Sequence, residues 1–239
     1  MEFVGIIMAE HCSVWRRHIL STLKQYTAPA IMSASLLLNS IILLSYLNSP
    51  FSKIPVWDAK MYWDKARAIA GGNLLGDAVF HQAPLYQYFL APVIMVFGES
   101  LTAVYVIQAL VSALSCGLLY SIIKRVAGKR DAVIAACIFA LYGMQVFYTF
   151  KILSETVSIF LMLASFYFFV NFHKRGFLPL AGVFIGLLCL SKPHFLFLVP
   201  FAGLFLFSRV PRQRFGNSRK RNPALFLPRV SSLPWASPL

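Results

Sequence analysis

The first group with catalytic potential is a carboxylate in an aromatic segment. Asp58 lies in the segment 57–63, which reads WDAKMYW and follows the first long apolar stretch of the chain. A carboxylate at a lipid–water boundary loses hydration, and this raises its pKa toward the range of a general base. A second interpretation is a solvated helix N-cap after Pro55, because Asp is favoured there. We therefore predict that Asp58 is a catalytic base, an N-cap, or both.

Two charged residues much later in the chain are further candidates. Glu155 follows Lys151 by four residues, a spacing that fits either a simple ion pair or a second functional carboxylate. Lys192 precedes Pro193 and could contact a phosphate or extend toward lipid headgroups. Asp58 and Glu155 would together supply two oxygen ligands for magnesium or manganese, although two ligands do not establish a metal site.

Other side chains near Asp58 allow two interpretations each. His81 could donate a hydrogen bond to a phosphate or cap its own loop. The nearby aromatic rings could stack on a sugar or form an interfacial belt. These rings are Trp57, Tyr62, Trp63, Tyr86 and Tyr88. We interpret Asp64, Asp77 and Glu99 as solvated and His194 as interfacial.

The composition is that of a membrane protein. Hydrophobic residues make up 59% of the 239 residues and charged residues 13%, and the mean hydropathy is +0.70. Soluble domains are about 45–50% apolar and about a quarter charged. The long apolar stretches predict an all-α, multi-pass transmembrane bundle. The net charge of +14 does not indicate nucleic-acid binding, because the basic residues cluster at helix ends and in the tail. The four cysteines are too dispersed for a disulfide framework or a zinc site.

Six spans and one long loop organise the chain. The predicted spans are 29–47, 100–123, 132–150, 152–172, 177–191 and 194–207. If the N-terminus is cytoplasmic, most of the 22 Lys and Arg residues lie in cytoplasmic segments, as the positive-inside rule requires. The outer face then gathers the remaining polar candidates, namely Asp58, Asp64, Asp77, His81, Glu99, Glu155, Lys192 and His194.

The segments outside the spans have distinct characters. Residues 1–28 are predicted to form a cytoplasmic N-terminal segment, and residues 29–207 to form the transmembrane domain with its outer loop at 48–99. Within that loop, 57–70 is predicted as a surface helix that ends at the glycines of 71–72, and 87–98 as an interfacial or re-entrant helix. The tail, 208–239, is basic and rich in proline, which is typical of a disordered cytoplasmic tail. It could equally be the out-of-frame end of an interrupted gene.

Several short motifs resemble a known family. They are Asp58-x-x-x-Tyr62, Gly-Gly-Asn at 71–73, Phe80-x-x-Ala-Pro-Leu-Tyr-x-Tyr, Phe-Gly-Glu-Ser at 97–100, Ser154-Glu155 and Ser-Lys-Pro at 191–193. This set resembles bacterial glycosyltransferase family 39, relatives of the dolichyl-phosphate-mannose protein mannosyltransferases with the GT-C fold. The resemblance covers about residues 30–207.

The resemblance implies a site and a substrate. In that family an outer-loop aspartate acts beside the anomeric carbon of a sugar carried on a polyprenyl phosphate, which implies this role for Asp58. The implied substrate-binding residues are Tyr62, His81, Pro84, Tyr86, Glu155 and Lys192. Lipid A-modifying members carry a lysine beside the proline that corresponds to Pro84. Here that position is Ala83, so His81, Lys192 or a metal ion would have to contact the phosphate.

The sequence therefore predicts a membrane glycosyltransferase of the bacterial plasma membrane. It would transfer a sugar from a polyprenyl-phosphate carrier to a hydroxyl of a protein, lipid or glycan at the outer face, with the lipid bilayer as its other partner. Family members usually have more spans and often a further C-terminal domain, so a truncated, catalytically silent remnant is the main alternative. A lipid or solute transporter is disfavoured, because the ionisable groups lie at span ends.

Overall fold

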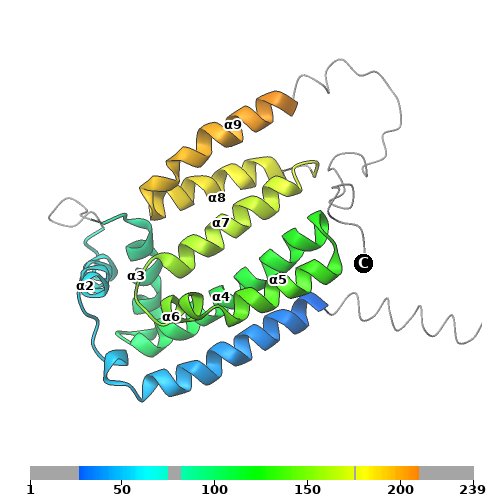
Figure 1. Ribbon diagram of the computed structural model, residues 1–239. Coiled ribbons are helices and arrows are strands. Elements are labelled where there is room, and N and C mark those ends of the chain that lie inside the picture. The colour runs from blue at the N-terminus through cyan, green and yellow to red at the C-terminus, as the bar shows by residue number, and fades with distance from the viewer. Residues whose placement is uncertain (1–26, 75–81, 175, 210–239) are drawn as a thin grey trace, which may run out of the picture.

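The computed structural model describes residues 27–74, 82–174 and 176–209. Within these ranges the chain is helical and has no β-strand, so the predicted all-α class is confirmed. Figure 1 shows the longer helices side by side, with α2 and α3 at one end of the bundle. The helices are Thr27–Leu47, η1 (Pro50–Ser52), α2 (Asp58–Ala70), α3 (Leu85–Phe97), α4 (Leu101–Val126), α5 (Lys129–Leu141), α6 (Gly143–Thr149), α7 (Glu155–Val170), α8 (Phe177–Ser191), η2 (Pro193–Phe197) and α9 (Leu198–Arg209).

The apolar helices differ in their ability to cross a bilayer. Thr27–Leu47 and Leu101–Val126 are long and apolar enough to span it, and α5 with α6 forms a pair that is bent by 55°. A crossing helix needs about 20 residues. The remaining apolar helices, α3, α7, α8 and the stretch Pro193–Leu204, are shorter than that. All six predicted spans are predominantly helical, but the span predicted at 132–150 is interrupted at Tyr142, whose backbone is extended. Two or three of the six meet the length requirement.

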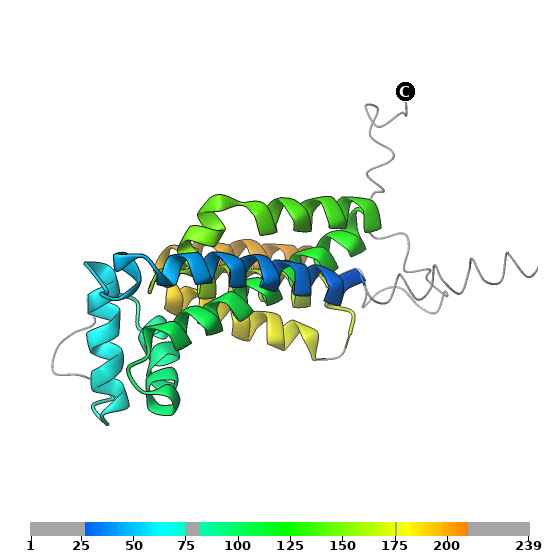
Figure 2. The same ribbon diagram turned by 90° about the horizontal axis from the view of Figure 1, so that it is seen from below.

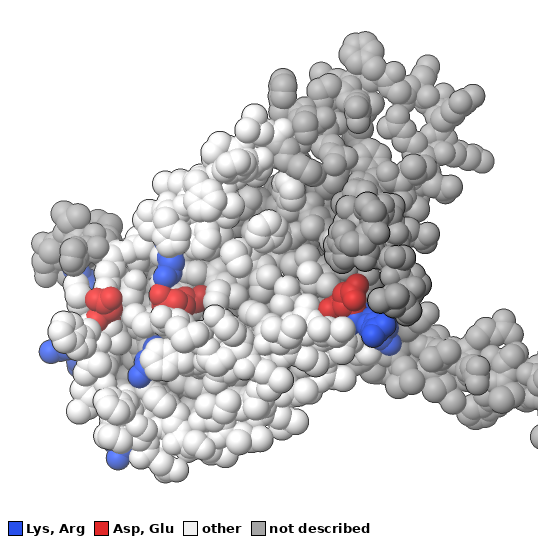
Figure 3. Space-filling model, in the orientation of Figure 1, with Lys and Arg blue, Asp and Glu red and all other residues white. Residues whose placement is uncertain are grey.

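One end of the bundle collects segments that are distant in sequence. Figure 2 shows α2 and α3 lying across this end rather than along the long helices. The start of α7 and the end of α8 line a common cavity with α2, so they lie at the same end. On the face drawn in Figure 3, charged side chains gather toward the two ends of the molecule and leave an uncharged flank between them. Such a flank is what a hydrocarbon layer requires.

The surface helix predicted at 57–70 is α2, and its boundaries have local causes. Gly71 occupies its C-cap, and Gly72, with φ of 100°, turns the chain away. Trp57 occupies the N-cap position, and its side chain makes no capping hydrogen bond. Asp58 is the first residue of the helix itself, so the N-cap interpretation of Asp58 is wrong. Its charge still favours the helix, because a carboxylate in the first turn complements the helix dipole.

A buried cluster supports the end of the bundle that carries α2. Tyr62, Trp63 and Ala66 of α2 are buried against residues of α3, α4 and α7. Tyr62 packs edge-on against Tyr86, with ring centroids 5.1 Å apart. This arrangement favours aromatic pairing beyond the area that it buries. The inner face of α2 is thus anchored, while Asp58 at its start remains exposed.

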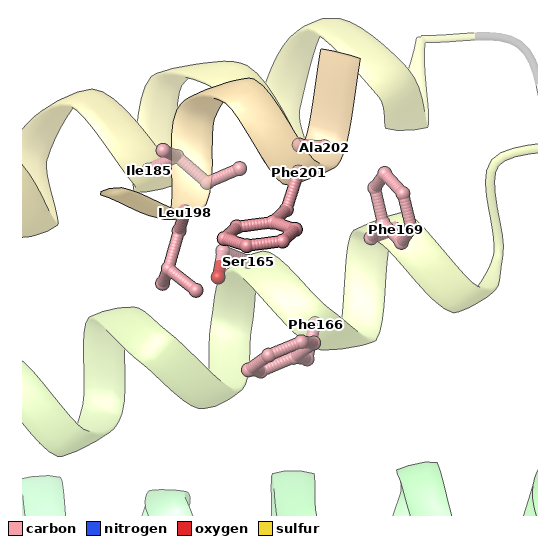
Figure 4. A pocket seen from close by; sticks show the side chains of 7 residues that line it. All are labelled: Ser165, Phe166, Phe169, Ile185, Leu198, Phe201 and Ala202. Atoms are coloured by element: carbon pink, nitrogen blue, oxygen red, sulfur yellow. The ribbon is translucent and has the colours of Figure 1, made fainter. Parts of the chain in front are cut away.

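A separate hollow lies between α7, α8 and α9. It has a volume of about 170 Å³, and its lining consists of apolar side chains with one serine. Figure 4 shows the side chains that line this hollow, among them the rings of Phe166, Phe169 and Phe201 and the hydroxyl of Ser165. The lining holds no ionisable side chain, so this hollow offers binding space without catalytic groups.

Candidate active site

A polar cavity of about 300 Å³ opens at the end of the bundle where α2 lies. Its lining comes from four separate segments: the start of α2, the approach to α3, the start of α7, and the junction of α8 with η2. The lining residues are Asp58, Tyr62, Gln82, Ala83, Leu153, Ser154, Glu155, Ser191, Lys192, Pro193 and His194. The structure thus brings together Asp58, Tyr62, Glu155 and Lys192, four of the six predicted site residues that it describes.

The centre of the cavity is an ion pair between α7 and the end of α8. Nζ of Lys192 donates to Oε1 of Glu155 at 2.6 Å, and the two side chains are 27% and 26% exposed. Exposed ion pairs contribute little to stability, but this pair is largely shielded, so its removal has a larger effect. Below it, the hydroxyls of Ser158 and Ser191 lie 2.7 Å apart and join the same two helices.

This ion pair bears on the interpretations that the sequence allowed for Glu155 and for Lys192. Glu155 does not pair with Lys151, because Lys151 lies outside α7 and the helical spacing does not apply to it. Lys192 does not simply extend toward solvent, since Glu155 holds its ammonium. The second carboxylate oxygen of Glu155, Oε2, is buried and has no hydrogen-bond partner among the described residues. A buried acceptor without a partner is unfavourable until a donor arrives.

Asp58 lines the cavity and directly follows a strained turn at Trp57. Its side chain is exposed, and the residue before it, Trp57, has φ of 53°, which is uncommon for a residue other than glycine. Trp57 is also 90% exposed, an unusual environment for so large an apolar side chain. Backbone strain of this kind is concentrated at functional sites. The turn directs α2 so that its first carboxylate lies at the cavity.

Tyr62 provides a permanent hydrogen-bond donor beside these carboxylates. Burial is the main cause that raises the pKa of the Tyr62 phenol, and the charges of Glu155 and Asp58 raise it further. A hydrogen bond with Ser154 and the charge of Lys192 act in the opposite direction. Because the net shift is upward from 10, the phenol stays protonated below pH 10 and can donate to a substrate oxygen.

Tyr86 lies beneath the cavity, which differs from its predicted contact with substrate. Its side chain is fully buried and its hydroxyl accepts a hydrogen bond of 2.7 Å from Nε2 of Gln108. The same Gln108 nitrogen lies 3.4 Å from the carbonyl oxygen of Leu153, in the cavity wall. Gln108 therefore connects α3 and α4 to the segment before Glu155. The sequence did not indicate Gln108, although a lone amide in an apolar span was an available signal.

We expect Gln108→Leu to lower the rate of any reaction at this cavity by about threefold to tenfold. The substitution removes the hydrogen bond to Tyr86 and leaves that hydroxyl buried without its donor, an effect of about 1 kcal/mol. Gln145→Leu is the matched control, because Gln145 is also a buried glutamine and does not line the cavity. Turnover and thermal unfolding of both variants measure the effect. Equal losses in the two variants would contradict the positioning role.

The remaining predicted site residues lie in different places. Pro84 is half-buried at the N-cap position of α3 and does not line the cavity, whereas the preceding Gln82 and Ala83 do. His81 lies outside the described residues. The sequence analysis also missed the lining roles of Ser154 and Ser191. Their position directly before Glu155 and Lys192, within two of the short motifs, was the available signal.

The described residues offer little to a metal ion. They contain no group of three or more His, Cys, Asp or Glu side chains placed to hold one. Asp58 and Glu155 do line one cavity, but Glu155 already has Lys192 as its counter-ion at 2.6 Å. A divalent cation would have to displace that ammonium, because magnesium and manganese bind carboxylate oxygens directly.

Comparison with known proteins adds one match. A family model described as dolichyl-phosphate-mannose-protein mannosyltransferase matches residues 81–235. This stretch contains Glu155 and Lys192, whereas Asp58 and Tyr62 precede it. Searches of curated proteins and of solved structures found no match.

Proposed function

The chain belongs to the dolichyl-phosphate-mannose-protein mannosyltransferase family, and from this premise we propose that it transfers a sugar from a polyprenyl-phosphate carrier to a hydroxyl acceptor. The observation that carries the proposal is the polar cavity in which Asp58 accompanies the Glu155–Lys192 pair. The carboxylate of Asp58 has no lysine partner, whereas that of Glu155 pairs with Lys192, so the two differ in reactivity. The first can accept a proton, and the second can orient a substrate.

In the proposed reaction Asp58 is the general base. The oxygen of the acceptor hydroxyl bonds to the anomeric carbon, and the bond from that carbon to the phosphate oxygen breaks. The phosphate leaves with the bonding electron pair, and the carboxylate of Asp58 takes the hydroxyl proton. Asp58 suits this role because its side chain is exposed at the cavity and has no ion pair with any described residue.

Glu155 and Tyr62 suit the binding of a sugar. A sugar hydroxyl would satisfy the buried Oε2 of Glu155, which has no donor among the described residues. The protonated phenol of Tyr62 would donate to another sugar oxygen. Lys192 holds Glu155 in place and keeps the cavity from carrying two uncompensated carboxylates.

We also propose an orientation in the membrane. The cavity lies at the end of the bundle opposite the basic segment 124–130, which joins α4 to α5. Basic segments favour the cytoplasmic side. The cavity would then face the outer side of a bacterial plasma membrane, where polyprenyl-phosphate sugars are presented to acceptors, and the N-terminus would be cytoplasmic.

Transfer from labelled donors tests the proposed function. Membranes that contain the full chain are incubated with labelled polyprenyl-phosphate mannose and, in parallel, with other polyprenyl-phosphate hexoses. The expected result is labelled product with at least one lipid-linked donor and none with a nucleotide-linked donor. A correctly inserted protein that transfers from no polyprenyl-phosphate sugar would contradict the proposal and favour the silent remnant.

We expect transfer to persist when divalent cations are removed. The reason is that Lys192, rather than a metal ion, is the counter-ion of Glu155. Activity is measured before and after EDTA treatment, with re-addition of magnesium or manganese as the control. If activity is lost in EDTA and restored by either cation, Asp58 and Glu155 act as metal ligands and Lys192 moves away when the metal binds.

A further inference from the structure

A second cavity meets the polar cavity at Asp58. It has a volume of about 260 Å³, and Asp58 and Leu153 line both cavities. Its other lining residues are mostly aromatic and aliphatic: Tyr46, Phe51, Ile54, Pro55, Val56, Trp57, Ala59, Tyr105, Phe147, Phe150, Lys151 and Ile152. We call it the aromatic cavity. Its place beside Asp58 makes it accessible to a substrate that reacts there.

Lys151 is the cation of the aromatic cavity. Its Nζ lies 5.2 Å from the ring centroid of Phe147, 5.4 Å from that of Tyr46 and 5.8 Å from that of Phe51. It also donates a hydrogen bond of 3.5 Å to the Tyr46 hydroxyl. Aromatic faces attract an ammonium and fix its position, but they do not neutralise its charge. In the described ranges no carboxylate lies within ion-pair distance of Lys151.

The aromatic rings around Lys151 are themselves held in place. Tyr46 packs edge-on against Tyr105 and stacks on Phe150, with centroid distances of 5.4 Å and 5.9 Å. The Tyr46 hydroxyl donates to the carbonyl oxygen of Phe51 at 3.0 Å, and that of Tyr105 donates to the carbonyl oxygen of Ser52 at 3.2 Å. Lys151 is therefore held in a preorganised site rather than on a mobile surface loop. Preorganisation lowers the entropic cost of binding a ligand.

The two cavities differ in charge and polarity. The polar cavity carries two carboxylates, Asp58 and Glu155, against one ammonium that is already engaged. The aromatic cavity carries one carboxylate, Asp58, and the ammonium of Lys151. An anion therefore meets less repulsion in the aromatic cavity. Phe51, Ile54 and Val56 in its lining are all more than half exposed, which leaves apolar surface for a lipid chain attached to the anion.

From this juxtaposition we infer that the aromatic cavity binds the phosphate of a lipid-linked substrate, with Lys151 as the phosphate contact. The inference rests on the proposed function and deepens it by naming the residue that contacts the phosphate of the donor. The phosphate lies beside Lys151, the attached chain follows the exposed apolar rim, and the sugar reaches Asp58 where the two cavities meet. Lys192 remains with Glu155 and orients the sugar.

Binding of polyprenyl phosphate without a sugar tests the assignment. The purified full chain in phosphatidylcholine nanodiscs is titrated with polyprenyl phosphate, and complexes are counted by native mass spectrometry. We expect Lys151→Met to weaken binding by about tenfold to a hundredfold, because it removes a charge-assisted contact. Lys151→Arg should stay within about threefold of the native chain. Lys60→Met, an exposed lysine on α2 that lines neither cavity, should have no effect.

Two further ligands separate the possible sources of the phosphate. Polyprenol, which lacks the phosphate, should bind the native chain and Lys151→Met equally, and this result also shows that the variant keeps its cavity. Phosphatidylglycerol should bind both proteins equally as well. If Lys151→Met loses phosphatidylglycerol binding but keeps polyprenyl phosphate, Lys151 contacts a bilayer headgroup and the assignment is overturned.

Other outcomes also decide the question. Native-like binding of polyprenyl phosphate by Lys151→Met, or a loss of that binding in Lys192→Met alone, overturns the assignment. If Lys151→Met does not fold, Lys151→Gln is measured instead, because it lacks the charge but keeps a polar group near Tyr46. Binding is measured without transfer, so a chain that binds through Lys151 but transfers no sugar contradicts the proposed function alone.

Discussion

Asp58→Asn should abolish sugar transfer while leaving the protein inserted and folded. The amide has nearly the shape of the carboxylate but cannot accept the acceptor's proton. General bases contribute about a hundredfold to ten-thousandfold to a rate, so we expect the transfer rate to fall by a factor in this range. The side chain of Asp58 is exposed and makes no ion pair with a described residue, so the loss of its charge should change stability by no more than its interaction with the helix dipole, about 1 kcal/mol or less.

The matched control for this variant is Asp64→Asn. Asp64 lies on the same helix, α2, and is also exposed, but it lines neither cavity. Labelled transfer from polyprenyl-phosphate sugar should be native-like in the control and undetectable or nearly so in Asp58→Asn. Substantial transfer by Asp58→Asn, with insertion and thermal unfolding unchanged in both proteins, would falsify the assignment of Asp58 as the base.

The second large effect concerns the partly buried ion pair. Lys192→Met leaves the Glu155 carboxylate without its counter-ion, and Glu155→Gln removes the negative charge that holds the ammonium. We expect each single variant to lose at least about tenfold in transfer, because one member of the pair then lacks its partner and is no longer held in a fixed position. The double variant should unfold at a higher temperature than Lys192→Met alone, since it no longer contains an uncompensated buried charge.

A double-mutant cycle and an exposed ion pair provide the comparison. Thermal unfolding of the native chain, both single variants and the double variant gives the coupling between the two side chains. Arg67 and Glu99 form a second ion pair of 2.7 Å, but their side chains are 47% and 57% exposed. Arg67→Met should therefore change stability and transfer very little. Comparable losses in Arg67→Met and Lys192→Met would show that the Glu155–Lys192 pair has no special role.

The proposed chemistry depends on helix ends rather than on helix interiors. Asp58 begins α2, Glu155 begins α7, and Lys192 directly follows α8. Backbone groups at helix ends are not all engaged within the helix, so polar side chains and ligands are accommodated there. A membrane enzyme can therefore combine an apolar body with a polar site only where several helices end together. The two cavities that share Asp58 lie at such a place.

The elements that the sequence predicted correctly are those with strong local signals. The helix at 57–70 and its end at Gly71 and Gly72 were visible because glycine stops a helix and the charged face repeats with helical spacing. The apolar helix at 87–98 corresponds to α3, which is followed by Gly98 with φ of 67°. Charge distribution alone placed Asp58, Glu155 and Lys192 at one boundary, and the polar cavity brings these three together.

The predictions that differed from the structure concern the ion-pair partner of Glu155 and the burial of Tyr86. Helical spacing suggested a Lys151–Glu155 pair, but α7 begins only at Glu155, so Lys151 belongs to the preceding turn and joins the aromatic cavity. Tyr86 was expected at the substrate, yet packing of α2 on α3 buries it beneath Tyr62. Neither outcome follows from a local pattern, because both depend on which helices meet.

The sequence by itself determined that the chain is a helical membrane protein, that the helix at 57–70 ends at the glycines of 71–72, and that Asp58, Glu155 and Lys192 lie close to helix ends. These properties follow from local hydrophobicity, glycine positions and charge, each of which acts over a few residues. Only the tertiary structure decided that Lys192 rather than Lys151 holds Glu155, that Asp58 keeps its carboxylate exposed, and that two cavities meet there. Those features require contacts between residues that are 37 or more positions apart in the chain, and packing between helices selects them.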